Sequence, residues 1–439
     1  MFEKTIIRVS TSGQGVLSRR GFIRGVSLGV GAAGLAGVSF TDVMALNADD
    51  LRKRQMACIL LWMGGGPSQL DTFDPKPDHA NGGSIKTIET AVPGIRIAEG
   101  WEHTAKVMND VALIRSMTNK EGNHQRAAYQ VHTGYAPTGT LKHPNIGCVA
   151  ASELGDPKFD LPHMVAVNGP TIGAGFLGVG LEPFIVQNPE QPPANAALPA
   201  SVGAHRFQRR LGLLHALENS GFERTGGADR VKDHASLYKQ TAGLVLSPRM
   251  KAFHVQDEPA AVRSAYGQTQ FGQGCLLARR LVQAGVTFVE VRSAGPAGAG
   301  NWDTHKDNHE KIKTLAGDVD PAFAALIADL KSKGMLDRTL VLWMGEFGRT
   351  PKINPNAGRD HFPWVFNVAL AGGGVKGGQF IGASSADGTE VKDHPVAVND
   401  LLATVCHALK IDAHKENMTP VGRPIRIVDG GKVVKSLFA

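Results

Sequence analysis

The sequence Ala57-Cys58-Ile59-Leu60-Leu61-Trp62-Met63 is followed at once by Gly64-Gly65-Gly66-Pro67-Ser68-Gln69-Leu70-Asp71. An unbroken apolar run that ends in a glycine-rich turn is typical of a buried strand. Similar short apolar runs recur along the chain and alternate with helical patterns; they span residues 111–114, 164–167, 286–291, 340–344 and 366–370. This alternation predicts an α/β fold, doubly wound around a mostly parallel sheet.

The length and composition favour a single large domain. The chain has 439 residues, of which 42% are hydrophobic and 20% are charged, and its 53 glycines indicate many tight loops. Large α/β enzymes often form one core with insertions. Residues 200–285 carry long amphipathic helical patterns, at 229–246 and 270–284, with little strand signal. We interpret this stretch as a helical insertion, within one domain that spans residues 46–439.

The charge and the cysteines exclude some functions. Part of the formal net charge of +7 comes from a basic N-terminus, and elsewhere bases mix with acids. With 6% aromatic residues there is no stacking platform for single strands, so we expect no nucleic-acid binding. The four cysteines are far apart and lie in apolar stretches. They are expected to be buried small residues, with a disulfide as the alternative.

The N-terminal segment resembles a twin-arginine export signal. Ser18-Arg19-Arg20-Gly21-Phe22-Ile23-Arg24 precedes a weakly apolar run that is rich in glycine and alanine. The alternative is a membrane anchor, but the run is short for a bilayer of about 30 Å. Cleavage after Ala45 would leave no stable transmembrane span, whereas an uncleaved signal would tether the protein. We therefore expect the twin-arginine export machinery as a partner and a periplasmic or secreted location.

Metal-capable side chains follow several of the predicted strands. Asp71 follows the first strand, Asp303 and His305 follow the strand at 286–291, and Glu346 follows the strand at 340–344. In open parallel sheets, ligands bind beyond the carboxyl ends of the strands. The side chains are therefore expected to converge there.

The densest polar cluster lies in the loop after Glu346. This loop contains Arg349 and then the run Gly358-Arg359-Asp360-His361. Carboxylates and imidazoles of this kind are ligands for Zn²⁺, Mn²⁺, Mg²⁺ or Ca²⁺. A nearby arginine can clamp an anionic ester. The bland alternative is that each Asp or His only caps a helix or closes a turn, and several strand ends with the same chemistry speak against it.

A loop that opens a helix carries further candidates. Gly122-Asn123-His124-Gln125-Arg126 precedes a helical pattern, and a helix N-terminus is a natural site for a phosphate or sulfate group. His124 is expected to be a ligand or an acid/base group, and Arg126 to orient the anion. Seven other histidines have no such support and are expected to be structural: His132, His143, His163, His205, His215, His254 and His407.

Four motifs together resemble the domain of unknown function 1501 (DUF1501), which is similar in fold to the alkaline phosphatase and sulfatase superfamily. They are Gly65-Gly66-Pro67-Ser68-Gln69-Leu70-Asp71-Thr72-Phe73-Asp74-Pro75-Lys76-Pro77, Trp302-Asp303-Thr304-His305, Gly345-Glu346-Phe347-Gly348-Arg349-Thr350-Pro351 and Gly358-Arg359-Asp360-His361. The resemblance covers nearly all of the chain after the leader.

The resemblance implies an alkaline phosphatase-like sheet with a divalent-metal site that hydrolyses phosphate or sulfate esters. Glu346 and His361 match the acid and the histidine of that site best, followed by Asp303 and His305. Sulfatases carry a Cys or Ser nucleophile at the helix start, where this chain has Asn123. Water activated by the metal would replace that nucleophile. The alternative functions are a non-catalytic exported binding or scaffold protein and a redox protein, although the chain has no cysteine or haem motif for redox chemistry.

Overall fold

The computed structural model describes residues 55–194, 196–199, 201–221, 237–238, 240–296 and 300–438. These belong to one compact unit, Lys53–Ala439. The leader with its twin arginines lies outside the described residues, as does half of the helix predicted at 229–246. Among the described residues, no helix combines the length and the apolar character needed to cross a membrane.

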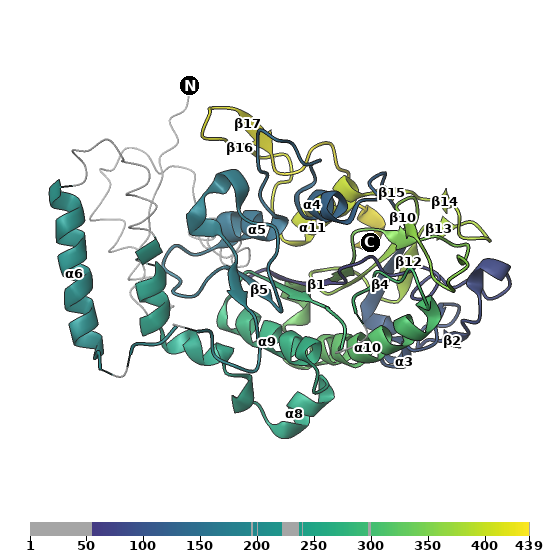
Figure 1. Ribbon diagram of the computed structural model, residues 1–439, viewed down its shortest axis with the longest axis horizontal. Helices are drawn as coiled ribbons and strands as arrows, with labels where there is room; N and C mark the ends of the chain where they lie inside the picture. The colour runs from purple at the N-terminus through teal and green to yellow at the C-terminus, as the bar shows by residue number, and fades with distance from the viewer. Residues whose placement is uncertain are drawn as a thin grey trace, which may run out of the picture. The chain divides into compact units, whose positions relative to one another are not determined.

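A sheet of nine strands forms the centre of the fold (Figure 1). Its order is β12 (Gln379–Ile381), β4 (Val111–Thr118), β11 (Phe366–Ala371), β8 (Thr339–Met344), β1 (Ala57–Trp62), β7 (Phe288–Arg292), β5 (Met164–Val167) and β6 (Phe184–Val186), with β15 (Val396–Ala397) beside β4. Only β11 runs antiparallel to its neighbours β4 and β8. The predicted mostly parallel α/β sheet is confirmed.

Strand β1 lies at the centre and is buried on both faces. Ala57, Ile59 and Leu61 pack into one hydrophobic cluster, while Cys58 and its alternate neighbours pack into a second. Side chains alternate across a strand, so a continuous apolar run is what a strand covered on both faces requires. The apolar patterning of the sequence thus explains why β1 is central. All four cysteines are buried and free, as predicted.

Helices cover both faces of the sheet, which makes it doubly wound (Figure 1). One layer contains α9 (Gln270–Ala284), α10 (Asn308–Ser332) and α3 (Glu102–Lys106). The other layer contains α4 (His124–Thr133), α5 (Ile146–Leu154) and α11 (Val398–Ala408).

The stretch interpreted as an insertion has two different parts. It includes α6 (Ala204–Gly221) and α8 (Ala260–Ala265), but α9 packs on β1 and β7 and belongs to the layer that covers the sheet. The predicted bounds of α9 agree with the structure. The Thr269 hydroxyl accepts a hydrogen bond from the N–H of Gly272, and Gly285 ends the helix with a φ of 107°.

Four small antiparallel ladders complete the described fold. They are β2 (Thr87–Glu89) with β3 (Arg96–Ala98), β9 (Gly348–Arg349) with β10 (His361–Phe362), β13 (Ala383–Ser384) with β14 (Val391–Asp393), and β16 (Glu416–Met418) with β17 (Pro424–Arg426). The ladder of β9 and β10 matters for the site, because it places His361 opposite Arg349.

Candidate metal centre

The loops after three adjacent strands bring the candidate side chains together. Strands β8, β1 and β7 are neighbours and run parallel, so their carboxyl ends meet at the same edge of the sheet. Glu346 follows β8, the glycines of 64–66 follow β1, and Asp303 follows β7. The N-terminus of α4 brings His124 to the same place.

Three imidazole rings surround the carboxylate of Asp303. Its Oδ1 atom lies 3.3 Å from Nε2 of His124, 3.1 Å from Nε2 of His305 and 3.3 Å from Nε2 of His361. The ligand atoms of His124, Asp303 and His361 all lie within 4.8 Å of one another. These side chains are separated by up to 237 positions in the sequence, from His124 to His361, yet they lie together. We call the group of His124, Asp303, His305 and His361 the Asp303 cluster.

The partners of Nδ1 fix the tautomers of two of these rings. Nδ1 of His361 lies 2.8 Å from the carbonyl oxygen of Gly122, which can only accept, so Nδ1 carries the proton. Nδ1 of His305 lies 2.7 Å from Oδ1 of Asp360 and donates to that carboxylate. In the neutral rings both Nε2 atoms then present lone pairs, and they lie 3.0 Å apart.

His124 is held in the same way by Glu346. Nδ1 of His124 lies 2.6 Å from Oε1 of Glu346, and the same oxygen accepts the N–H of Gly65 at 2.9 Å. Both Glu346 Oε2 and His124 Nε2 are buried without a hydrogen-bond partner among the described residues. Histidines that bind metals usually donate their other ring N–H to a carboxylate or a carbonyl, as all three rings do here.

The charges in the cluster favour an ionised Asp303. Burial opposes the charge, but the hydrogen bond and charge of Arg349, aided by the neighbouring histidines, lower the pKa of Asp303 to about 2. The hydrogen bond to Glu346 raises the pKa of His124. Burial and the charge of Arg349 lower the pKa of His361, which favours its neutral, metal-binding form.

The donor set fits a divalent cation. Three imidazole nitrogens and a carboxylate oxygen converge, and their lone pairs repel one another unless a proton or a cation lies between them. Nitrogen-rich sets of this kind suit Zn²⁺ better than Mg²⁺ or Ca²⁺, which prefer oxygen. Nε2 of His124 and Oε2 of Glu346, which are buried without a hydrogen-bond partner among the described residues, also favour a bound cation.

Arg349 supports the cluster from behind. It is fully buried, and its guanidinium donates to the carbonyls of Gly65, Gly66 and Arg359 and to Oδ1 of Asp303. The sequence predicted that Arg349 would clamp an anionic substrate, but its guanidinium nitrogens are all engaged within the protein and none is exposed to do so. The structure thus places Arg349 as the residue that orients Asp303.

Three other predicted residues take different places. Asp71 is buried against Arg359 and Ser68 and is not part of the Asp303 cluster. Arg126 is half-exposed and pairs with Glu121 at 2.7 Å. Asp360 contributes its carboxylate to His305 and stands behind the cluster.

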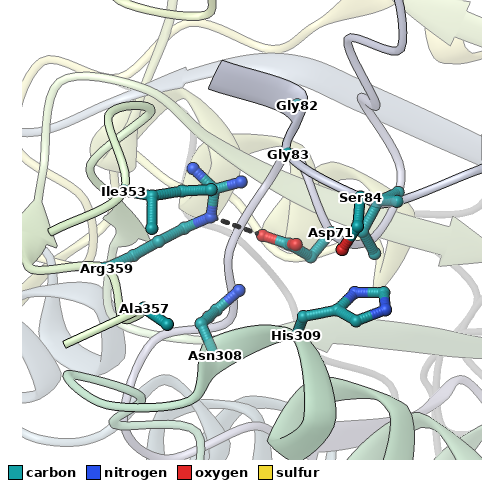
Figure 2. A pocket seen from close by; sticks show the side chains of 10 residues that line it. Asp71, Gly82, Gly83, Ser84, Asn308, His309, Ile353, Ala357 and Arg359 are labelled. Atoms are coloured by element: carbon teal, nitrogen blue, oxygen red, sulfur yellow. Dashed lines mark ion pairs between the residues drawn. The ribbon is translucent and has the colours of Figure 1, made fainter. Parts of the chain in front are cut away.

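A small cavity lies beside Asp71, and Figure 2 shows its lining. Its volume of about 30 Å³ is far below the roughly 300 Å³ at which ligand pockets begin. None of its lining residues belongs to the Asp303 cluster. It is therefore not where an ester substrate would bind.

Arg359 is a residue of the site whose role sequence reasoning missed. The motif Gly358-Arg359-Asp360-His361 drew attention to its last two residues, yet Arg359 is 1% exposed and makes contacts on several sides. Its position immediately before two site residues was the one available signal, and the identity of its partners depends on loops that are distant in the sequence.

The chain was compared with protein families, with curated proteins and with solved structures. No curated protein matches the chain. Among solved structures, a sulfatase from Pseudoalteromonas sp., PsFucS1, is 12% identical, with 83% of this chain and 70% of that chain covered and a TM-score of 0.38. An alkaline phosphatase from the Antarctic bacterium TAB5 is 11% identical, with 81% and 98% covered and a TM-score of 0.37.

A third solved structure is the lipoteichoic acid synthase LtaP from Listeria monocytogenes, which is 10% identical, with 88% and 80% of the two chains covered and a TM-score of 0.39. Identities and TM-scores this low say nothing about what the chain acts on. The family described as "Protein of unknown function (DUF1501)" matches residues 55–438, and the chain belongs to that family.

Proposed function

We propose that the chain is an exported hydrolase of phosphate or sulfate esters that depends on one divalent cation of the zinc type. The observation that carries the proposal is the convergence of three Nε2 atoms on Oδ1 of Asp303. His124, Asp303, His305 and His361 would hold the cation, while Glu346, Asp360 and Arg349 hold these ligands in place. When bound, the cation would polarise the ester and make water a better nucleophile near neutral pH.

The chain's own residues add an anion site next to this cation. Helix α4 begins at His124, so the free N–H groups of its first turn are adjacent to the Asp303 cluster. The side chain of Asn123 accepts the N–H of Arg126 and leaves the earlier donors available. A phosphate or sulfate group can therefore be oriented by backbone N–H groups, with no need of Arg349.

A scaffold function is the second candidate, and one observation favours it. The helix start has Asn123 and His124 where a Ser, Thr or Cys would supply a side-chain nucleophile. A protein that kept the cation site without hydrolysis would look the same. Metal content and turnover together separate the two candidates.

The test uses purified protein, zinc analysis and aryl phosphate and aryl sulfate esters. Stoichiometric zinc with turnover that Asp303→Asn abolishes supports the hydrolase. Zinc without turnover on either ester supports the scaffold. Protein that binds no zinc, manganese, magnesium or calcium contradicts both.

Export by the twin-arginine machinery is part of the same proposal. It is supported by Arg19-Arg20 and the weakly apolar run that follows. Replacement of both arginines by lysine should retain the protein inside the cytoplasm, as judged by cell fractionation. Unchanged export of that variant would contradict the proposed route.

A further inference from the structure

Arg359 has a buried guanidinium that faces one carboxylate and donates to three backbone carbonyls. Nε lies 2.7 Å from Oδ2 of Asp71, Nη2 donates to the carbonyl of Asn81 at 2.8 Å, and Nη1 donates to the carbonyls of Thr350 and Pro351. Side chains of Arg359 and Asp71 are 1% and 2% exposed. Figure 2 shows the two groups facing each other beside the small cavity.

The backbone of Arg359 contacts the segment that carries two proposed ligands. Its N–H donates at 3.0 Å to the carbonyl of Thr304, the residue between Asp303 and His305. The preceding glycine, Gly358, packs so closely on the main chain of His305 that a Cβ atom would collide with it. The loop at 358–361 and the loop at 303–305 are thus joined at Arg359.

Two further contacts lead from Arg359 to the cluster. Its carbonyl accepts Nη1 of Arg349 at 3.2 Å, and Arg349 in turn holds Oδ1 of Asp303. The residues that follow Arg359 are Asp360, which holds His305, and His361. Three of the four proposed ligands are therefore positioned by groups bonded to Arg359 or next to it in sequence.

The carboxylate of Asp71 is held by contacts with Arg359 and Ser68. Oδ2 faces Nε of Arg359 and also accepts the hydroxyl of Ser68. Asp71 belongs to the loop after β1, and Gly65 and Gly66 of the same loop give their carbonyls to Arg349. The ion pair therefore ties the loop after β1 to the loop that carries His361.

We propose that the buried Asp71–Arg359 ion pair is a positioning device that sets the spacing of Asp303, His305 and His361 and thereby the affinity of the site for its cation. This inference rests on the proposed cation site and adds a role for two residues that touch neither cation nor substrate. Outer-shell partners of metal ligands typically change affinity about 10–100-fold when they are replaced.

The test measures zinc affinity by titration calorimetry on the full mature chain, at a temperature where circular dichroism shows every variant folded. Asp71→Asn keeps size and an acceptor, and Arg359→Lys keeps the charge, so both should fold. The double variant Asp71→Asn/Arg359→Gln removes both charges and leaves no buried charge unpaired. Each is expected to bind zinc about 10–100-fold more weakly than the parent.

A matched control is available at Arg279. It is 2% exposed and pairs with Glu258 at 2.9 Å and Asp329 at 2.8 Å, in the helical layer that contains α9 and α10. Arg279→Lys should lower the melting temperature as Arg359→Lys does, yet bind zinc within about twofold of the parent. A merely structural role for Arg359 would make the two variants behave alike.

Three results overturn the inference. If the parent binds zinc and Asp71→Asn and Arg359→Lys bind equally well, the positioning role is wrong while the cation site stands. If Asp71→Asn weakens zinc binding by far more than about 100-fold while Arg359→Lys has little effect, Asp71 is itself a ligand and the positioning role is wrong. If the parent binds no zinc and no manganese, magnesium or calcium either, the proposed function fails as well.

Discussion

Nε2 of His305 lies 3.0 Å from Nε2 of His361, although the proton of each neutral ring is on its other nitrogen. Two lone pairs at this distance repel each other, and both also face Oδ1 of Asp303. A cation between them removes the repulsion. The hydrogen bonds of the two Nδ1 atoms hold the rings so that both Nε2 atoms are directed at the position of such a cation.

Loss of a proposed ligand should weaken zinc binding more than loss of any supporting residue. Asp303→Asn and His361→Ala are each expected to raise the zinc Kd by more than about 100-fold, the upper range for outer-shell changes. The measurement is calorimetric titration of the purified protein. His414→Ala serves as a control, because His414 is exposed and is not one of the histidines whose Nε2 atom faces Asp303. Equal affinity of Asp303→Asn and the parent would refute the ligand set.

Glu346 should act on the cation through His124. Glu346→Gln keeps the shape but removes the charge that accepts the proton of Nδ1, so zinc should bind about 10–100-fold more weakly. The pKa of His124, followed by NMR in the zinc-free protein, should fall toward its ordinary value. If the pKa of His124 stays raised in Glu346→Gln, Glu346 does not have this role.

Zinc should stabilise the protein more at higher pH. Glu346 raises the pKa of His124, so the zinc-free fold is stabilised by the proton below the unfolded value of about 6.5, and this contribution is lost as pH rises through the folded pKa. Zinc must displace that proton. The gain in melting temperature on adding zinc should therefore grow from about pH 6 to about pH 8. Asp303, with a pKa of about 2, stays ionised throughout.

The control for this pH dependence is Glu346→Gln, in which the rise should occur at lower pH. A gain in melting temperature that is constant or declines over the same interval would contradict the assignment of His124 as the ligand that loses a proton.

Gly65 should be irreplaceable for geometric reasons. Its φ is 113°, its N–H donates to Glu346, and an added Cβ would collide with the main chain at Trp302 and Asp303. Gly65→Ala is expected to cost about 2 kcal/mol of unfolding free energy and at least tenfold in zinc affinity. Urea unfolding and calorimetry measure the two effects.

Gly94 provides the matched comparison. Its φ is 82°, but an added Cβ would meet nothing within 4 Å. Gly94→Ala should therefore show only the cost of backbone strain, about 1 kcal/mol, with zinc affinity unchanged. Gly65→Ala that behaves no worse than Gly94→Ala would remove the argument from close packing.

Arg349 should matter for stability as well as for the site. Arg349→Lys leaves several buried carbonyls without a donor and weakens the pairing of Asp303, at an expected cost of about 3 kcal/mol in urea unfolding. Arg126→Lys, at a half-exposed pair, should change stability by less than about 0.5 kcal/mol. Similar costs for the two variants would be inconsistent with the buried role of Arg349.

Much of the fold could be predicted because runs of apolar residues and helix-capping residues are visible in short stretches of the sequence. The apolar run at β1 and the cap residues Thr269 and Gly285 around α9 depend on neighbours in the chain. The antiparallel direction of β11 and the two-residue ladder of β9 and β10 could not be predicted. They follow from pairings between distant segments, for which short sequences carry no signal.

The site shows the same division. Ligands gather at the carboxyl ends of parallel strands, and this rule predicted that Asp303, His305, Glu346 and His361 lie close together, as they do. The same rule could not tell that Asp71 turns toward Arg359, because a side chain several residues beyond a strand is oriented by whichever loop packs against it. The metal and catalytic roles of all these residues stay predictions.

The most direct measurement is anomalous diffraction at the zinc edge from crystals of the mature protein grown with Zn²⁺. The proposed cation site predicts one strong peak about 2.0–2.2 Å from Nε2 of His124, His305 and His361 and from a carboxylate oxygen of Asp303. A peak bound instead by Asp71, or no peak at these three histidines, would contradict it.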